Sequence, residues 1–338
     1  MDIQQTLQRL LDREDLKAAE MCEVMRAIMS GRCTPAQIAG FLIALRMKGE
    51  SVEEITAAAE VMRDLSTRVD VKCDHLLDTC GTGGDGAGTF NISTTAAFVA
   101  AAAGARVAKH GNRSVSGKSG SADVLEAAGV KLELAPAQVA ECINRIGFGF
   151  MYAPAHHGAM KHALGPRREL GVRTLFNLLG PLTNPAGATC QLVGVYSDKW
   201  LGKIALVLRN LGSKHVMVVH AGDGMDEISI SAPTHVAELI DGEIKKYRIS
   251  PEQFAMKRST LIEITAGTVN DSLGAMINVF DNKPGPARDV VLLNAGAAVY
   301  TAGVAGNMEV GIDKARQAIT SGAAREKLKQ LVELTGSF

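Results

Sequence analysis

The sequence predicts an α/β protein in which a small all-helical domain is joined to a large α/β domain with a central, mostly parallel sheet. Residues 1–66 carry only helical periodicity, whereas short apolar runs alternate with helical patterns in the rest of the chain. The first two of these runs each lead into a glycine-rich loop. We expect the small domain to span residues 1–70, joined by about 157–185, and the large domain to comprise 71–156 and 186–338.

The N-terminal helices are predicted by apolar spacing and by capping residues. Ile3, Leu7, Leu10 and Leu11 share one face of a first helix, and residues 16–29 form a second that ends at Gly31. Two further helices begin where a Thr or Ser is followed three residues later by Gln or Glu, which is the pattern of a capping box. These pairs are Thr34 with Gln37 and Ser51 with Glu54. The polar residues 66–74 are typical of a linker.

The remaining chain predicts strands, a hairpin and further helices. Strands are expected at residues 76–78, 105–108, 148–152, 191–196 and 215–219. Asp241-Gly242 predicts a hairpin turn between strands at 237–240 and 244–247. Helices are expected at about 252–257, 271–281, 293–301 and 308–335. Residues 154–185 interrupt the alternation and are expected to be helical and irregular.

Composition excludes several classes of function. The 338 residues include 36 basic and 36 acidic side chains, so no overall field attracts nucleic acid or an anionic membrane. An aromatic content of 4% argues against a base-stacking surface. The six cysteines and eight histidines lack metal-ligand spacing, which predicts reduced thiols and no zinc site. The N-terminus lacks a signal-peptide pattern and residues 96–105, the longest apolar stretch, are too short to span a bilayer, so we expect a soluble cytoplasmic protein.

The first glycine-rich loop, Gly81 to Thr94, has the composition of a diphosphate-binding loop. Glycines allow successive N–H groups to point inward, and a following helix start adds a positive dipole end. Ser93 or Thr94 could offer a hydroxyl group to a metal ion or a phosphate. The alternative is a flexible turn in which Ser93 is a simple N-cap. The loop matches neither the phosphate-binding loop that ends in G-K-[ST] nor the dinucleotide fingerprint G-x-G-x-x-G.

The second loop, Lys109 to Asp123, combines cations with small residues. Lys109, Arg113 and Lys118 alternate with glycines and serines. Small residues permit close approach to the backbone, and hydroxyl groups and cations donate to anionic oxygens. A solvated cationic turn would explain the charges but not their alternation with glycine and serine. We therefore expect this loop to bind an anion, and two such loops would suit a substrate with phosphates at both ends.

Two further segments each allow two interpretations when only their residues are considered. Asp226-Glu227 follows a predicted strand, and adjacent carboxylates there suit Mg²⁺ and its phosphate ligands as well as they suit an acidic surface turn. Arg167, Arg168 and Arg173 could recognise a carboxylate. An ordinary helix with an ion pair between Glu169 and Arg173 is the interpretation that their spacing favours.

Together these segments make the chain resemble the anthranilate phosphoribosyltransferase family. The match extends over essentially the whole chain and is strongest in four segments: Asp78-Thr79-Cys80-Gly81-Thr82-Gly83-Gly84-Asp85, Lys109 to Asp123, Arg173 to Pro185, and Asp226-Glu227. Small departures from the family pattern are Ser114 in place of a common alanine and Met225 in place of the usual leucine. Neither removes a side chain with a chemical role.

The resemblance implies the reaction, the cofactor and the residues of the site. The expected reaction is that of anthranilate with phosphoribosyl pyrophosphate, giving N-(5-phosphoribosyl)anthranilate and pyrophosphate in tryptophan biosynthesis. The resemblance also implies a homodimer. Mg²⁺ would be bound by Ser93, Asp226 and Glu227. Anthranilate would be contacted by Gly81, Asn112 and Arg167. The residues implied to hold the phosphoribosyl donor are Gly81, Gly84, Asp85, Thr89, Asn91, Ile92, Ser93, Thr94, Lys109, His110, Gly111, Asn112, Arg113, Ser114, Val115, Ser116, Gly117 and Ser121.

Two alternative functions remain open at this stage. A nucleoside phosphorylase of the pyrimidine type would share the expected fold but would use inorganic phosphate. A non-catalytic paralogue that binds nucleotide or nucleic acid would need no intact site. The acidic pair Asp226-Glu227 and the long second loop favour a donor that carries pyrophosphate and a metal ion. No general base is assigned, because an aniline nitrogen needs little activation; His110 is the one weak candidate, and a hydrogen bond that orders the loop is its expected role.

Overall fold

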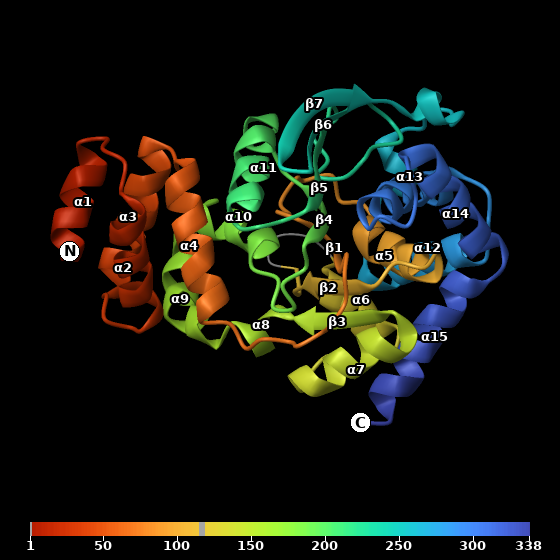
Figure 1. Ribbon diagram of the computed structural model, residues 1–338, viewed down its shortest axis with the longest axis horizontal. Helices are drawn as coiled ribbons and strands as arrows, with labels where there is room; N and C mark the ends of the chain where they lie inside the picture. The colour runs from red at the N-terminus through yellow and green to blue at the C-terminus, as the bar shows by residue number, and fades with distance from the viewer. Residues whose placement is uncertain (1, 115–118) are drawn as a thin grey trace.

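The computed structural model describes residues 2–114 and 119–338, and it contains a helical bundle beside a larger α/β body (Figure 1). The bundle is formed by α1 (Ile3–Leu11), α2 (Ala18–Met29), α3 (Pro35–Lys48) and α4 (Val52–Asp64), as the sequence predicts. Both predicted capping boxes are present: the Thr34 side chain accepts from the Gln37 N–H at 3.3 Å, and that of Ser51 from the Glu54 N–H at 3.2 Å.

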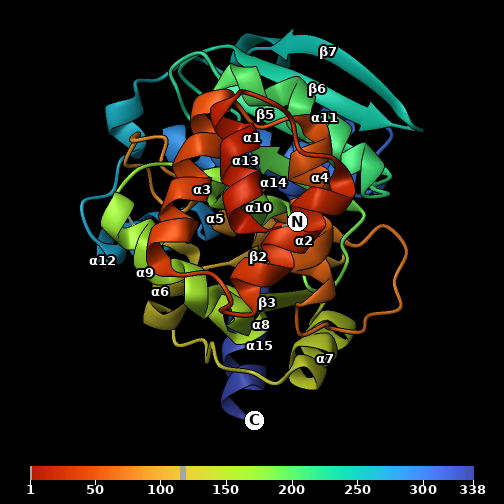
Figure 2. The ribbon, with the colours of Figure 1, turned by 90° about the vertical axis from the view of Figure 1, so that its left-hand side faces the viewer.

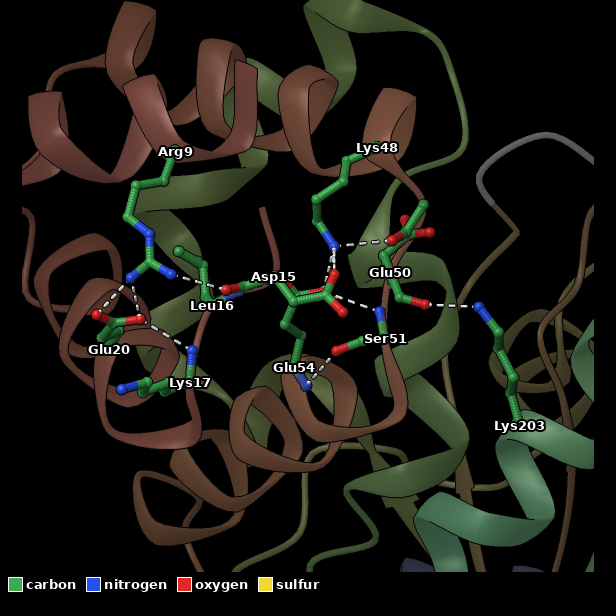
Figure 3. Close-up of polar contacts among 11 residues, drawn as sticks. Arg9, Asp15, Leu16, Lys17, Glu20, Lys48, Glu50, Ser51, Glu54 and Lys203 are labelled. Carbon is green, nitrogen blue, oxygen red and sulfur yellow. Dashed lines mark hydrogen bonds and ion pairs between the residues drawn. The ribbon is translucent and has the colours of Figure 1, made fainter. Parts of the chain in front are cut away.

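A buried carboxylate joins the loops of the bundle. The Glu54 side chain is fully buried and accepts hydrogen bonds from the backbone N–H groups of Leu16 and Ser51, at 2.9 and 2.8 Å (Figure 3). The Lys48 ammonium also donates to Glu54, at 2.8 Å. Because each of these donors meets the buried charge, the loop after α1 and the loop before α4 are held together. Lys203 of α11 (Leu201–Asn210) extends the connection by donating to the Glu50 carbonyl at 2.8 Å (Figure 3).

The α/β body is organised around one seven-stranded sheet with the order β3-β2-β1-β4-β5-β6-β7. The first five strands in chain order pair in parallel, and β6 and β7 form the antiparallel hairpin that Asp241-Gly242 predicts. A central, mostly parallel sheet is thereby confirmed. The strands are β1 (Leu77–Gly81), β2 (Val107–Gly111), β3 (Phe148–Tyr152), β4 (Cys190–Gly194), β5 (His215–Ala221), β6 (Thr234–Ile240) and β7 (Glu243–Ile249).

Helices cover both faces of the sheet, because alternate strand residues enter two different apolar clusters. Leu192 and Met217 belong to one cluster and Val193 and Val218 to the other. The second cluster is completed by α11 and by the N-terminal bundle, which lies in front of the sheet in Figure 2. The helices of the first cluster are α5 (Ile92–Ala102), α6 (Ser121–Ala127), α7 (Pro136–Ile146), α12 (Val269–Phe280), α13 (Pro286–Thr301), α14 (Met308–Thr320) and α15 (Ala323–Gly336).

The segment between β3 and β4 returns to the N-terminal bundle. It contains α8 (Ala153–His156), α9 (Lys161–Leu170) and α10 (Leu175–Leu179), with one 3₁₀ turn between α8 and α9 and another after α10, in agreement with the prediction of a helical and irregular segment. α9 packs against α2 and α3, and α10 packs against α4. No helix within the described ranges is long and apolar enough to cross a membrane.

Three predicted helices differ from the structure at their boundaries. The helix expected at 308–335 is divided into α14 and α15, because Gly322 adopts a φ of +76° that breaks the helical path. The helix expected at 293–301 is the second half of α13. The helix begins earlier, at Pro286, because its first turn has no apolar residue pattern from which the start could be predicted. The helix expected at 252–257 is a 3₁₀ turn at Pro251–Phe254.

Candidate functional site

The predicted functional residues gather at the carboxyl edge of the parallel strands. The chain leaves β1 toward β2 and β3 on one side and later enters β4 on the other side of β1, so the strand order reverses between β1 and β4. Ligands of open α/β sheets bind outside such a reversal. Gly81, the last residue of β1, pairs with Gly194 of β4. The two glycine-rich loops follow β1 and β2, and the Asp226-Glu227 turn follows β5.

The first loop owes its path to glycine. Gly83, Gly84, Gly86 and Gly88 have φ values of +67°, +71°, +79° and +63°, which side chains disfavour. α5 then begins at Ile92 with Asn91 in the N-cap position. The alternative in which Ser93 is a simple N-cap is therefore wrong.

The second loop is braced by Asp123 at the start of α6. One carboxylate oxygen of Asp123 accepts from the Ser114 N–H at 3.0 Å and from the Gly120 N–H at 2.9 Å. Arg113 forms ion pairs with Asp123 at 3.2 Å and with Glu126 at 2.6 Å. Its guanidinium is thus already paired with acidic side chains of α6. Val115, Ser116, Gly117 and Lys118 lie outside the described residues.

Lys109 is not part of a solvated turn. Only 2% of this residue is exposed, and its ammonium donates to the Thr79 carbonyl and lies 3.5 Å from the Ser93 hydroxyl. Burial lowers the pKa of Lys109, and the nearby Asp78 side chain opposes that shift. The ammonium group therefore lies inside the fold, next to Ser93 at the start of α5.

The two loops are in direct contact through Asn91. Its Oδ1 accepts from the Ser119 hydroxyl at 2.8 Å, and its Nδ2 donates to the Ser119 carbonyl at 3.2 Å. The Ser272 hydroxyl of α12 donates to the same Oδ1 at 2.6 Å and accepts from the Asn91 N–H at 3.0 Å. The loops after β1 and β2 therefore form one continuous surface.

The acidic pair belongs to the same surface. Asp226 accepts from the Gly83 N–H at 2.7 Å, and Glu227 accepts from the Ser93 N–H at 3.1 Å. A side chain in place of Gly81 would place Cβ 2.5 Å from the Asp226 carboxylate, and one in place of Gly194 would place it 1.5 Å from the Asp226 carbonyl oxygen. The pair is thus packed against the first loop and the strand ends.

The electrostatics of this turn favour a bound cation. Burial raises the pKa of Asp226 to about 7, with Asp85 adding repulsion, and burial raises the pKa of Glu227 to about 8, with Asp226 adding repulsion. A divalent cation would offset both the burial and the repulsion of the ionised carboxylates. Oxygen donors are also the ligands that Mg²⁺ prefers. Within the described ranges no group of three His, Cys, Asp or Glu side chains is arranged to hold a metal ion. A cation at this turn would therefore need oxygens from substrate and water as well.

Two of the residues expected to contact anthranilate, Arg167 and Asn112, lie on α9 and in the second loop. Arg167 lies on α9 with its guanidinium 5.2 Å from the centre of the Phe176 ring. Burial lowers the pKa of Arg167, and none of the ion pairs between described residues involves this side chain. Asn112 follows the end of β2 and is exposed. A guanidinium without a protein carboxylate is suited to a substrate carboxylate.

Arg173 has a different environment from the one expected. α9 ends at Leu170, and the left-handed Gly171 turns the chain, so the predicted helical ion pair with Glu169 is wrong. Arg173 instead donates to the Gly84 carbonyl and lies 4.3 Å from the centre of the Tyr196 ring. Its own carbonyl accepts from Arg46 of α3. The residue therefore links the N-terminal bundle to the first glycine-rich loop.

Sequence reasoning missed a buried pair beneath the second loop. Asp78 of β1 accepts from the His110 N–H at 3.2 Å and from Asn184 Nδ2 at 2.7 Å. Asn184 also donates to the Ala108 carbonyl at 2.9 Å. The available signal was a charged residue inside an apolar strand. Burial lowers the pKa of His110 to about 3, which leaves its ring a poor proton acceptor.

Comparisons with known proteins match the chain over both of its parts. Residues 4–66 match the helical bundle domain of the glycosyl transferase family, and residues 73–325 match the a/b domain of that family. Anthranilate phosphoribosyltransferase of Thioalkalivibrio sulfidiphilus is 64% identical over 337 residues, covering 100% of both chains. That of Methylococcus capsulatus is 62% identical over 338 residues, covering 100% of this chain and 99% of its own.

Solved structures give the same result. Anthranilate phosphoribosyltransferase of Thermus thermophilus has a TM-score of 0.93 at 43% identity and covers 99% of both chains. The Saccharomyces cerevisiae enzyme in complex with PRPP and Mg has a TM-score of 0.92 at 26% identity, covering 99% of this chain and 98% of that one. The chain therefore belongs to the glycosyl transferase family with a helical bundle and an a/b domain, and within it to the anthranilate phosphoribosyltransferases.

Proposed function

We propose that this protein transfers the 5-phosphoribosyl group of phosphoribosyl pyrophosphate to the amino group of anthranilate, releasing pyrophosphate. The observation that carries the proposal is the contact of three elements at one edge of the sheet. The first loop meets the second through Asn91 and Ser119, and it meets Asp226 and Glu227 through backbone N–H groups. Together they present amide donors, a buried ammonium group and paired carboxylates, which is the donor set that a metal-bound diphosphate requires.

The donor would lie along the two loops. Backbone N–H groups of the first loop and the start of α5 would donate to the diphosphate oxygens. Ser93, Asp226 and Glu227 would hold Mg²⁺, in keeping with the complex of the yeast enzyme with PRPP and Mg. Residues proposed to bind the donor are Gly81, Gly84, Asp85, Thr89, Asn91, Ile92, Ser93, Thr94, Lys109, His110, Gly111, Asn112, Arg113, Ser114 and Ser121, together with Val115, Ser116 and Gly117, which lie outside the described residues.

Catalysis would depend on stabilising the leaving pyrophosphate. Magnesium, when bound, supplies positive charge to the diphosphate oxygens. Lys109 adds a buried positive charge beneath the same position, and the N–H groups of the first loop complete the stabilisation of the developing negative charge. These groups are fixed before reaction, because Lys109 and the loop are held by strand and helix contacts. Little reorganisation is then needed as the bond to C1 breaks.

The acceptor would be held by Arg167, Asn112 and Gly81. The Arg167 guanidinium would pair with the anthranilate carboxylate, which would direct the amino group toward C1 of the ribose. Alignment of this kind replaces a general base, since the aniline nitrogen is nucleophilic toward an oxocarbenium-like carbon. The low pKa of His110, about 3, agrees with a reaction that needs no base from this residue.

The organisation of the protein follows from the same proposal. Residues 1–70 with about 157–185 would form the small domain, and 71–156 with 186–338 the large domain that binds the donor. We propose a homodimer in the cytoplasm, acting on small molecules and not on nucleic acid or membranes. The zero net charge of the chain supports the last point, because no overall field attracts nucleic acid or an anionic membrane.

One assay separates this function from its alternatives. The protein is incubated with phosphoribosyl pyrophosphate and anthranilate, with and without Mg²⁺, and separately with pyrimidine nucleosides and inorganic phosphate. We expect N-(5-phosphoribosyl)anthranilate and pyrophosphate in equal amounts, formed only with Mg²⁺. Nucleoside cleavage by phosphate would instead identify a phosphorylase, and the absence of any product would favour a non-catalytic paralogue.

A further inference from the structure

Asn294, on α13, holds the residue that directly follows the acidic pair. Its Oδ1 accepts from the Ile228 N–H at 2.9 Å, and its Nδ2 donates to the Ile228 carbonyl at 2.8 Å. The second Nδ2 hydrogen is donated to the Val290 carbonyl of the same helix at 2.9 Å. The Asn294 residue is fully buried, so these hydrogen bonds are not exchanged with water. One side chain therefore satisfies both backbone groups of Ile228, as a neighbouring strand would.

The turn that carries the acidic pair also packs closely against two glycines. Gly194 leaves room for the Asp226 carbonyl oxygen, which a Cβ at that position would approach to 1.5 Å, and Gly81 leaves room for the Asp226 carboxylate. The Asp226 N–H also donates to Asp85 Oδ2 at 3.4 Å.

We propose that Asn294 is a positioning residue, which fixes the Asp226–Glu227 turn in the orientation needed to bind a divalent cation and diphosphate. The inference rests on the proposed function of the turn. Asn294 touches neither substrate nor metal, and it acts through the Ile228 backbone. An amide is needed there because the two backbone groups require one acceptor and one donor from a single side chain.

The chain offers a matched control on the same helix. Asn294→Leu keeps the approximate shape and removes all three hydrogen bonds, and Asn294→Asp keeps the acceptor while losing the donor. Thr301 is also fully buried on α13, and its hydroxyl donates to the Ala297 carbonyl of the same helix at 2.8 Å. Thr301→Val therefore removes a buried hydrogen bond of α13 at a residue with no recorded hydrogen bond to the acidic turn.

The test measures cation binding directly and then turnover. Mn²⁺ binding in the presence of pyrophosphate is followed by electron paramagnetic resonance of free Mn²⁺, at temperatures where circular dichroism shows each variant folded. We expect about tenfold weaker Mn²⁺ binding for Asn294→Leu and a smaller loss for Asn294→Asp. The Mg²⁺ concentration for half-maximal turnover should rise in parallel, while the KM for anthranilate changes less than about twofold.

Two results would decide against the role of Asn294. Unchanged Mn²⁺ binding in a folded Asn294 variant would overturn it, and so would an equal loss in Thr301→Val. If Asn294→Leu does not fold, Asn294→Asp decides by the same criterion. Absence of turnover by the wild-type protein would reject the proposed function, whereas the Mn²⁺ measurement would still report whether Asn294 supports the cation site.

Discussion

Arg167 is the side chain on which acceptor recognition depends. It has no recorded acidic partner among the described residues, whereas Arg113 already forms ion pairs with Asp123 and Glu126. Arg167→Ala should raise the KM for anthranilate about 10- to 100-fold with little change for the donor, since a charge-assisted hydrogen bond contributes about 1.5–3 kcal/mol. Steady-state kinetics with each substrate varied would measure this. Arg168→Ala, on the exposed neighbour, is the control, and an equal effect of both changes would reject the assignment.

His110 and His157 make the stability of the protein depend on pH. Their rings are 5.1 Å apart, and burial lowers the pKa of His110 to about 3 and that of His157 to about 4. Below the unfolded pKa of about 6.5, the unfolded chain binds protons that the folded protein does not, so stability should fall as pH decreases from 6.5 to 4.

His157→Gln should flatten this acid decline by up to about 1.4 kcal/mol per pH unit. Urea unfolding at several pH values between 7 and 4 provides the measurement. His235→Gln, at an exposed position, is the control substitution. A His157 variant with the wild-type slope would show that this ring titrates normally in the folded protein.

Residues with an unusual local pattern could be predicted from the sequence, and residues defined by distant partners could not. The glycines of the first loop and the Asp226-Glu227 pair stand next to predicted strand ends, so their location followed from the order of elements. Asp78 and Asn184 are 106 residues apart in the chain, and only the fold brings them together. Arg173 was assigned to a helix because its spacing from Glu169 fits one, but the left-handed Gly171 ends that helix first.

At the scale of elements, helix ends were harder to predict than helix existence. The sequence predicts one helix at 308–335, and the break between α14 and α15 is made by the backbone of Gly322. Gly322→Ala should lower the free energy of unfolding by about 1–2 kcal/mol, because its φ of +76° is unfavourable for a side chain. Its Cβ would contact nothing within 4 Å, so strain is the only effect expected.

Gly336→Ala is the control for this prediction. Gly336 lies in α15 with equally open surroundings and without a positive φ, so alanine should leave stability unchanged or raise it. Chemical unfolding of both variants tests the comparison. If the two variants have equal free energies of unfolding, α14 and α15 can join into one helix without a loss of stability.

At the scale of the whole molecule, the bundle packs against α11 through α4, and backbone hydrogen bonds of the segment after α4 add to the connection with the rest of the chain. The Thr67 N–H donates to the His156 carbonyl at 2.8 Å, and the Val69 N–H donates to the Pro185 carbonyl at 3.1 Å. Arg167 lies on α9, which packs against α2 and α3 of the bundle. The two glycine-rich loops, in contrast, follow strands of the sheet. We expect the two parts to approach each other when both substrates bind, which would exclude water from the reacting carbon.

Small-angle scattering tests this closure. The radius of gyration should decrease when the donor, Mg²⁺ and an unreactive anthranilate analogue are all present. The anthranilate analogue alone should leave the radius of gyration unchanged, because the two glycine-rich loops would still hold no donor. Identical scattering with and without the full set of ligands would show that the site is already formed in the free protein.

The central claim is that the magnesium-bound diphosphate lies between the two glycine-rich loops and the Asp226-Glu227 turn. Anomalous diffraction from crystals soaked with Mn²⁺ and phosphoribosyl pyrophosphate tests it most directly. We predict a manganese peak within bonding distance of the Asp226 and Glu227 carboxylates, which disappears in the Asp226→Asn, Glu227→Gln double variant. A manganese peak beside other residues, or diphosphate density away from both loops, would contradict the account.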